Sequence, residues 1–191
     1  MTARGIAMDE SSEPRRWDSL RLHAWDYTSP GAYFTTICTK GRKSFFGRIQ
    51  NGEVHLSTVG KQAHCLWERI PHHHSHLVLD EFIIMPNHVH GILFIHEVVA
   101  AFHETPPRHK KTGSSQRMSA ISPKPGSLSV VVRLYKGAVT RWARAHGYHD
   151  FSWQSRFHEH VIRNERELDS IRRYIRLNPM RWAMDRFNPG G

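Results

Sequence analysis

Runs of apolar residues separated by turn residues mark the strands of this chain. Residues 31–39 and 77–85 are rich in β-branched and aromatic side chains, a composition typical of strands inside a sheet. Another apolar run, 88–96, follows 77–85 after a break at Pro86 and Asn87. The break predicts a hairpin, and residues 31–39 are expected to form a central strand beside it.

The segment between these strands combines a turn with a helical pattern. Asn-Gly at 51–52 is a strong turn signal and predicts a short strand at 53–56. A helix should follow, because Ser57 can cap it and the next apolar residues recur every three or four positions until Pro71.

A longer helical pattern covers residues 127–146. Its apolar residues alternate at spacings of three and four, which predicts a helix with one face on a core. The predicted buried stripe consists of Leu128, Val131, Tyr135, Ala138, Trp142 and Ala145.

A late helix should begin at about Glu165. Asn164 and Glu167 resemble a capping box, and Leu168, Ile171 and Ile175 form the apolar stripe. Acidic residues open the segment and arginines close it, as the helix dipole prefers.

Two polar side chains share one face of this late helix. Tyr174 and Asn178 are four residues apart, so the phenol and the amide are stacked and can face the same space. Pro179 disfavours helical geometry at Asn178, and the helix should therefore end there.

The second strand of the predicted hairpin begins with His-Val-His. Side chains alternate between the faces of a strand, so His88 and His90 project from one face, close enough to share a metal ion. Asn178 offers an amide oxygen as a plausible third ligand. Two imidazoles and one hard oxygen suit Mg²⁺ or Mn²⁺, and Zn²⁺ is less suited because neither cysteine lies near these residues.

Helices interspersed with antiparallel strands indicate an α+β fold. A chain of 191 residues is long enough for one core, so residues 17–191 are interpreted as a single domain after a disordered tail at 1–16. Residues from about 100 to 126 are rich in Pro, Lys, Ser and Gly and predict a flexible insertion. The two cysteines do not form a disulfide framework, and no apolar run reaches membrane-spanning length, so a soluble cytoplasmic protein is expected.

His-x-His on a strand followed by Tyr-Ile-x-x-Asn-Pro on a late helix resembles the REP-associated tyrosine transposases, members of the single-tyrosine HUH superfamily. The resemblance covers about residues 18–185. Its N-terminal half lies in 27–39, Phe-Phe-Gly at 45–47 and 79–91, and its C-terminal half in Trp-Gln at 153–154, 159–163 and 174–182.

The resemblance implies an RRM-like (ferredoxin-like) HUH palm, with a central antiparallel sheet flanked by helices. It implies that Tyr174 forms a covalent link to the 5′ phosphate of cut single-stranded DNA, and that reversal of this step rejoins the strand. The implied partners are hairpins of short palindromic repeats, the implied compartment is a bacterial cytoplasm at the nucleoid, and a homodimer is possible.

Charge agrees with a nucleic-acid partner. The chain has 27 Lys and Arg against 17 Asp and Glu, a formal net charge of +10, which favours a polyanion through counterion release. A solvated basic surface has the same composition. The candidate DNA contacts are Arg133, Lys136, Arg141 and Arg144 on the outer face of the helix at 127–146, and Trp153, Arg156 and His158 before the late helix.

Three functions stay open at this point. The first is a tyrosine nuclease and strand transferase on single-stranded DNA. The second is a DNA-binding regulator that retains the fold without turnover, and the third is a metal-dependent hydrolase in which water attacks and Tyr174 is structural. An adduct between protein and DNA that survives denaturation would separate the first from the other two.

Overall fold

The computed structural model describes residues 29–97 and 126–188. The predicted tail at 1–16 lies outside the described residues, as does the predicted flexible insertion at about 100–126 except for Gly126.

A four-stranded antiparallel sheet forms the centre of the molecule, in the order β4-β5-β1-β6. Its strands are β1 (Gly31–Cys38), β4 (Leu77–Met85), β5 (His88–Ile95) and β6 (His158–Ile162). The predicted hairpin and the central position of β1 are confirmed. Strand β6 lies at an edge and was not among the predicted strands.

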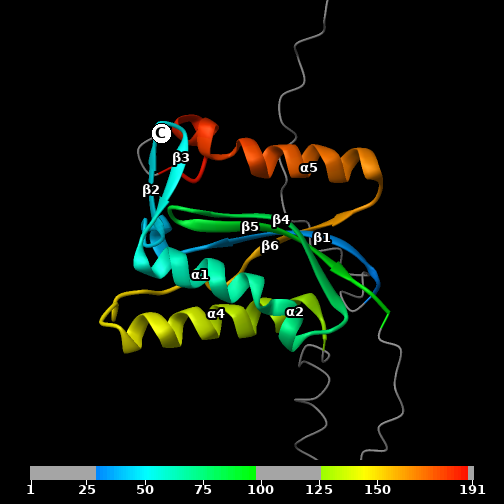
Figure 1. Cartoon of the computed structure of the whole chain (residues 1–191), viewed down its shortest axis with the longest axis horizontal. Helices are drawn as coiled ribbons and strands as arrows, with labels where there is room; N and C mark the ends of the chain where they lie inside the picture. Colours follow the sequence, from blue (N-terminus) through cyan, green and yellow to red (C-terminus); the bar gives the residue numbers. More distant parts are fainter. Residues whose placement is uncertain (1–28, 98–125, 189–191) are drawn as a thin grey trace, which may run out of the picture.

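Helices cover both faces of this sheet (Figure 1). Helices α1 (Thr58–Glu68), α2 (Ile70–His73) and α4 (Leu128–Ala145) lie on one face, and α5 (Glu165–Leu177) lies on the other. The α+β prediction is confirmed. Short 3-10 turns, η1 (Lys40–Arg42) and η2 (Pro179–Met184), follow β1 and α5.

A small second sheet pairs β2 (Gly47–Gln50) with β3 (Glu53–Leu56). Asn51 and Gly52 form its turn with φ of 53° and 75°. Positive φ at both central residues is the requirement of the tightest hairpin turns, which explains why Asn-Gly predicted this turn correctly.

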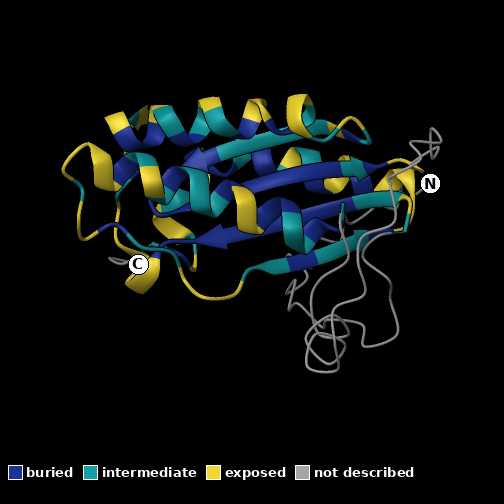
Figure 2. Ribbon diagram, turned by 90° about the horizontal axis from the view of Figure 1, so that it is seen from below, coloured by how far each residue is buried: buried dark blue, intermediate teal, exposed yellow. Residues whose placement is uncertain are grey.

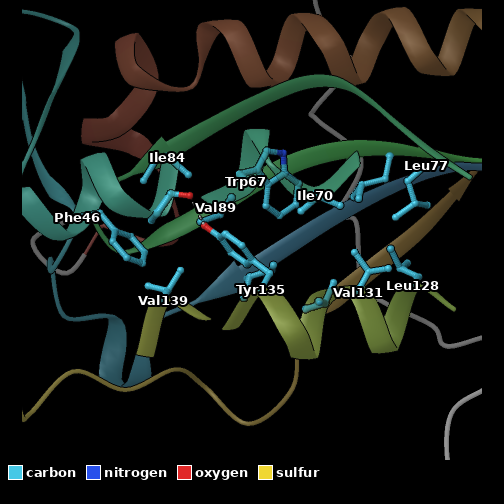
Figure 3. Close-up of a cluster of buried hydrophobic side chains, with 14 of the residues drawn as sticks. Phe46, Trp67, Ile70, Leu77, Ile84, Val89, Leu128, Val131, Tyr135 and Val139 are labelled. Carbon is cyan, nitrogen blue, oxygen red and sulfur yellow. Dashed lines mark hydrogen bonds between the residues drawn. The ribbon is translucent and has the colours of Figure 1, made fainter. Parts of the chain in front are cut away.

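The larger core lies between the sheet and helices α1 and α4. Trp67, Tyr135 and Phe46 are buried there with side chains from β1, β4 and β5 (Figure 3). A smaller core joins α5 to the opposite face through Phe34, Ile92, Ile162, Leu168, Ile171 and Ile175. Figure 2 shows the consequence, buried strands between helices whose outer faces are exposed.

The predicted stripe of α4 is wrong in its second half. Val139 and Ala143 are buried, whereas Ala138 and Trp142 are partly exposed and Ala145 is exposed. Strict alternation of three and four averages 3.5 residues per turn, so over a long helix of 3.6 residues per turn the predicted row drifts away from the core.

Within residues 29–97 and 126–188, no helix is both long and apolar enough to cross a membrane.

Candidate active site

His88 and His90 lie side by side on the face of the sheet that α5 covers. Their ring centroids are 4.4 Å apart, and the two residues are 0% and 1% exposed. Such burial strongly disfavours the charged imidazolium, and nearby positive charge adds to the effect. The pKa of His88 is held well below its usual value, and that of His90 falls to about 3. Both rings are therefore neutral, the state that binds metals.

Asn87 fixes the tautomer of His88. The Asn87 amide nitrogen donates to the carbonyls of Arg42 (3.0 Å) and Phe187 (2.6 Å), so its oxygen must be the atom that faces His88. That oxygen is 2.8 Å from His88 Nδ1, which therefore carries the proton. The Nε2 lone pair of His88 is left buried without a hydrogen-bond partner.

His90 is held in the same manner from the neighbouring strand. Its Nδ1 lies 2.9 Å from the hydroxyl of Thr36, its cross-strand partner on β1. Its Nε2 lies 3.3 Å from Tyr174 Oη, at the long end of hydrogen-bond distance. Both imidazoles are thus held through Nδ1, which leaves Nε2 of His88 without a partner and Nε2 of His90 next to Tyr174 Oη.

Helix α5 brings Tyr174 and Asn178 over this pair. Asn164 caps the helix at Glu167, as predicted, and Asn178 is its C-cap residue before Pro179. Burial raises the pKa of Tyr174 to about 12, although a hydrogen bond from Asn178 acts in the opposite direction. The Asn178 side-chain oxygen is buried and has no hydrogen-bond partner.

Three atoms near Tyr174 are the candidate ligands for a divalent metal ion. The unpartnered Nε2 of His88 and Oδ1 of Asn178 would otherwise be costly to bury, and Nε2 of His90 belongs to the same face. The described residues contain no cluster of three His, Cys, Asp or Glu side chains suited to a metal, so a metal ion bound here would need a ligand of another type, such as the Asn178 amide oxygen. Binding of Mg²⁺ or Mn²⁺ by these ligands stays a prediction.

A narrow cleft leads to Tyr174 along the edge of the sheet. Tyr174, His90, Thr36, His158, His160 and Arg186 are among its lining residues. Of the predicted DNA contacts, His158 is the one that this cleft contains. It lies on β6 opposite Thr36, in the same cross-strand row as His90.

The other predicted DNA contacts lie elsewhere. Arg133, Arg141 and Arg144 are exposed on α4, which covers the opposite face of the sheet (Figure 1). Lys136 is partly buried, and its ammonium donates to the carbonyl of Gln154 at 2.6 Å.

Trp153 and Arg156 occupy the segment between α4 and β6. The Trp153 indole nitrogen donates to the Lys136 carbonyl at 3.0 Å, and its ring centroid lies 5.3 Å from that of Phe46, which fastens the indole to the core. Arg156 is exposed.

Four residues of the site were not predicted from the sequence: Arg42, Asn87, Arg186 and Phe187. Asn87 could have been suspected from its position next to the His-x-His pair. The other three carried no periodic or motif signal, because their contacts depend on how the C-terminal residues fold back over β5.

No protein-family model matches the chain. An uncharacterized protein of Haemophilus influenzae (strain ATCC 51907 / DSM 11121 / KW20 / Rd) is 36% identical over 167 residues, which cover 87% of this chain and 90% of the relative.

Among solved structures, the REP-associated tyrosine transposase bound to a REP hairpin superimposes with a TM-score of 0.50 at 20% identity. The match covers 82% of this chain and 70% of that one. This likeness confirms the predicted fold.

Proposed function

Because the chain belongs to the same family as the Haemophilus influenzae protein and has the fold of a REP-associated tyrosine transposase, we propose that it cleaves and rejoins single-stranded DNA. Tyr174 is the proposed nucleophile. The proposed intermediate is a covalent 5′-phosphotyrosine, and the proposed substrates are hairpin-forming repeats, the kind of DNA bound in the solved structure.

One observation carries this proposal. The Tyr174 hydroxyl lies 3.3 Å from His90 Nε2, beside a set of donor atoms of which two are buried without a hydrogen-bond partner. A purely structural tyrosine would not need unpaired hydrogen-bond acceptors buried around it, since each such group costs free energy. The arrangement supports a nucleophile next to a metal-assisted phosphate site.

One residue of the site reacts with the DNA, and others hold the reacting groups in position. Tyr174 Oη attacks phosphorus and loses its proton to solvent, the bond from phosphorus to the 3′ oxygen breaks, and the 3′ oxygen leaves as a hydroxyl after taking one proton from solvent. Asn87 and Thr36 hold His88 and His90 in their orientation, and His90 Nε2 lies next to the phenol. The phosphotyrosine retains the energy of the broken bond, so reversal rejoins the strand without a nucleotide cofactor.

A divalent metal held by His88, His90 and Asn178 would polarise a phosphate oxygen and stabilise charge in the transition state. The phenol requires such help, because its raised pKa keeps Tyr174 protonated at neutral pH.

The proposal is tested by incubating the purified protein with end-labelled single-stranded hairpin DNA and Mn²⁺, followed by denaturing electrophoresis. Wild type should form an adduct that survives denaturation. Tyr174→Phe should form none and should still bind the hairpin, since only the nucleophilic oxygen is removed. His88→Ala, His90→Ala and an excess of chelator should each abolish the adduct.

Three results would contradict the proposal. Cleavage by the Tyr174→Phe variant at the wild-type rate would exclude the tyrosine mechanism, and cleavage without an adduct would favour hydrolysis by water. Hairpin binding with neither cleavage nor adduct would indicate a regulator that retains the fold.

A further inference from the structure

The chain after η2 folds back and packs against the site. Phe187 is 3% exposed, and its ring centroid lies 4.6 Å from that of His88 and 6.0 Å from that of His90. Its carbonyl accepts the hydrogen bond from Asn87 described above. Residues adjacent to Phe187 are therefore fixed relative to the two histidines.

Two guanidinium groups lie against the ring of Phe187. The Arg186 guanidinium carbon is 4.8 Å from the ring centroid and that of Arg42 is 5.3 Å away, both within cation–π range. Arg42 also donates a hydrogen bond to the backbone carbonyl of Arg186. This bond involves the main chain, so it holds the segment in place and leaves the Arg186 guanidinium available.

Arg186 places a positive charge close to the reaction centre. It lines the narrow cleft together with Tyr174 and His90, and its charge contributes to the lowered pKa of both histidines and opposes the raised pKa of Tyr174. Within the described part of the chain, neither Arg186 nor Arg42 forms an ion pair with a carboxylate. The nearby Asp185 side chain instead accepts a hydrogen bond from the Phe187 amide.

We propose that Arg186 binds the scissile phosphate next to Tyr174, with Arg42 bracing the segment that carries it. This inference rests on the proposed function and names a further catalytic residue for it. A guanidinium fork can donate two hydrogen bonds to phosphate oxygens, on which negative charge accumulates as the Tyr174 oxygen bonds to phosphorus and the 3′ oxygen departs. Arg186 exchanges no proton in this step, because the guanidinium stays charged throughout.

The test compares Arg186→Ala and Arg186→Lys with Arg181→Ala, which removes an exposed arginine of η2 that does not line the cleft. The readout is the single-turnover rate of adduct formation at saturating DNA. Arg186→Ala should lower this rate about 10²- to 10³-fold, the usual effect of losing one preorganised donor to a transition-state oxyanion. The rate of Arg186→Lys should lie between those of wild type and Arg186→Ala. Guanidinium ion added to the solution should partly restore the rate of Arg186→Ala and should not change the rates of the other variants.

A second measurement separates this proposal from the cleavage mechanism. Binding of an uncleaved hairpin is measured in the Tyr174→Phe background, where Arg186→Ala should weaken affinity about tenfold and Arg181→Ala about twofold or less. If wild type forms no adduct but this difference is present, the phosphate contact stands and the cleavage mechanism fails. If Arg186→Ala and Arg181→Ala have the same rate and the same affinity, the proposal for Arg186 is overturned.

Discussion

At the scale of single residues, Asn87 determines which nitrogen of His88 is free. Two carbonyl acceptors orient its amide, and its oxygen then requires a proton on His88 Nδ1. Thr36 plays the corresponding part for His90 with a hydroxyl, which can either donate or accept. The constraint on His88 is therefore the stricter of the two.

Replacing Asn87 with Ala should weaken Mn²⁺ binding about 10- to 100-fold, the usual cost of losing a partner that orients a ligand. Thr36→Val should have a smaller effect on Mn²⁺ affinity. Isothermal titration of the protein without DNA measures both affinities directly, and the circular dichroism spectrum reports whether each variant is folded. Equal Mn²⁺ affinity for wild type and Asn87→Ala would show that the amide does not orient a ligand.

The site residues that could be predicted from the sequence are those that lie two to four positions from another site residue. His88 with His90, and Tyr174 with Asn178, are each close in sequence, so strand and helix periodicity place them on one face. Their meeting under α5 followed from the family resemblance. Arg186 is 144 residues from Arg42, and a contact across that separation has no local signature.

At the scale of elements, an ion pair ties α5 to the edge strand β4. Arg172 donates through Nε and Nη2 to the two carboxylate oxygens of Asp80, at 2.8 and 2.7 Å. These hydrogen bonds lower the pKa of Asp80. The pair helps to hold the helix that carries Tyr174 in register over the sheet.

Replacing Asp80 with Asn should reduce the free energy of unfolding by about 1–2 kcal/mol at neutral pH. A depressed folded-state pKa adds stability above the unfolded-state value, and this contribution is lost as pH falls through the folded-state value. The difference from wild type should therefore be constant above about pH 5 and shrink below about pH 4, which urea unfolding at several pH values measures.

Asp169→Asn is the matched control for the Asp80 substitution. Asp169 also contacts Arg172, at 3.1 Å, but its side chain is 66% exposed, so its loss should cost about 0.5 kcal/mol or less. Equal destabilisation by the two variants would contradict the specific role of Asp80.

The close approach of α1 to the sheet depends on Gly91. A Cβ atom at Gly91 would lie 2.2 Å from Cζ2 of the fully buried Trp67. Gly91→Ala should therefore lower the free energy of unfolding by about 1–3 kcal/mol through overpacking. Gly137→Ala should be neutral or stabilising, because on α4 the added Cβ meets the flexible end of Arg141. A Gly91→Ala variant as stable as wild type in urea would contradict this packing.

Element boundaries were predictable where turn and cap residues are explicit. Pro-Asn at 86–87, Asn-Gly at 51–52, Ser57 and Asn164 each mark an observed boundary. Strand β6 was missed because His158–Ile162 begins with three polar residues and shows no clear alternation of apolar ones. Its identity as a strand depends on pairing with β1.

At the scale of the whole molecule, the predicted DNA contacts are divided between the two sides of the sheet, and His158 alone among them lines the cleft. The cleft of Tyr174 lies on the α5 side, whereas Arg133, Arg141 and Arg144 belong to α4 on the other side (Figure 1). A hairpin that contacted both would have to extend around an edge of the sheet. The net charge of +10 does not decide between the two surfaces.

The double variant Arg141→Ala and Arg144→Ala tests the α4 surface. If both residues contact phosphates, the slope of log affinity against log salt should fall in magnitude by about 1.4, equally for every DNA sequence. The melting temperature should barely change, because both side chains are exposed. An unchanged slope would show that the outer face of α4 is solvated and does not contact DNA, and binding would then be expected on the side of the cleft.

The most direct test of the central claim is to locate the bond between protein and DNA. After reaction with a single-stranded hairpin and Mn²⁺, the protein is digested with protease and nuclease, and the linked peptide is sequenced by mass spectrometry. We expect Tyr174 to carry a nucleotide attached through its 5′ phosphate and the released strand to end in a 3′ hydroxyl. A nucleotide attached to another residue, or cut DNA with no attached peptide, would contradict the claim.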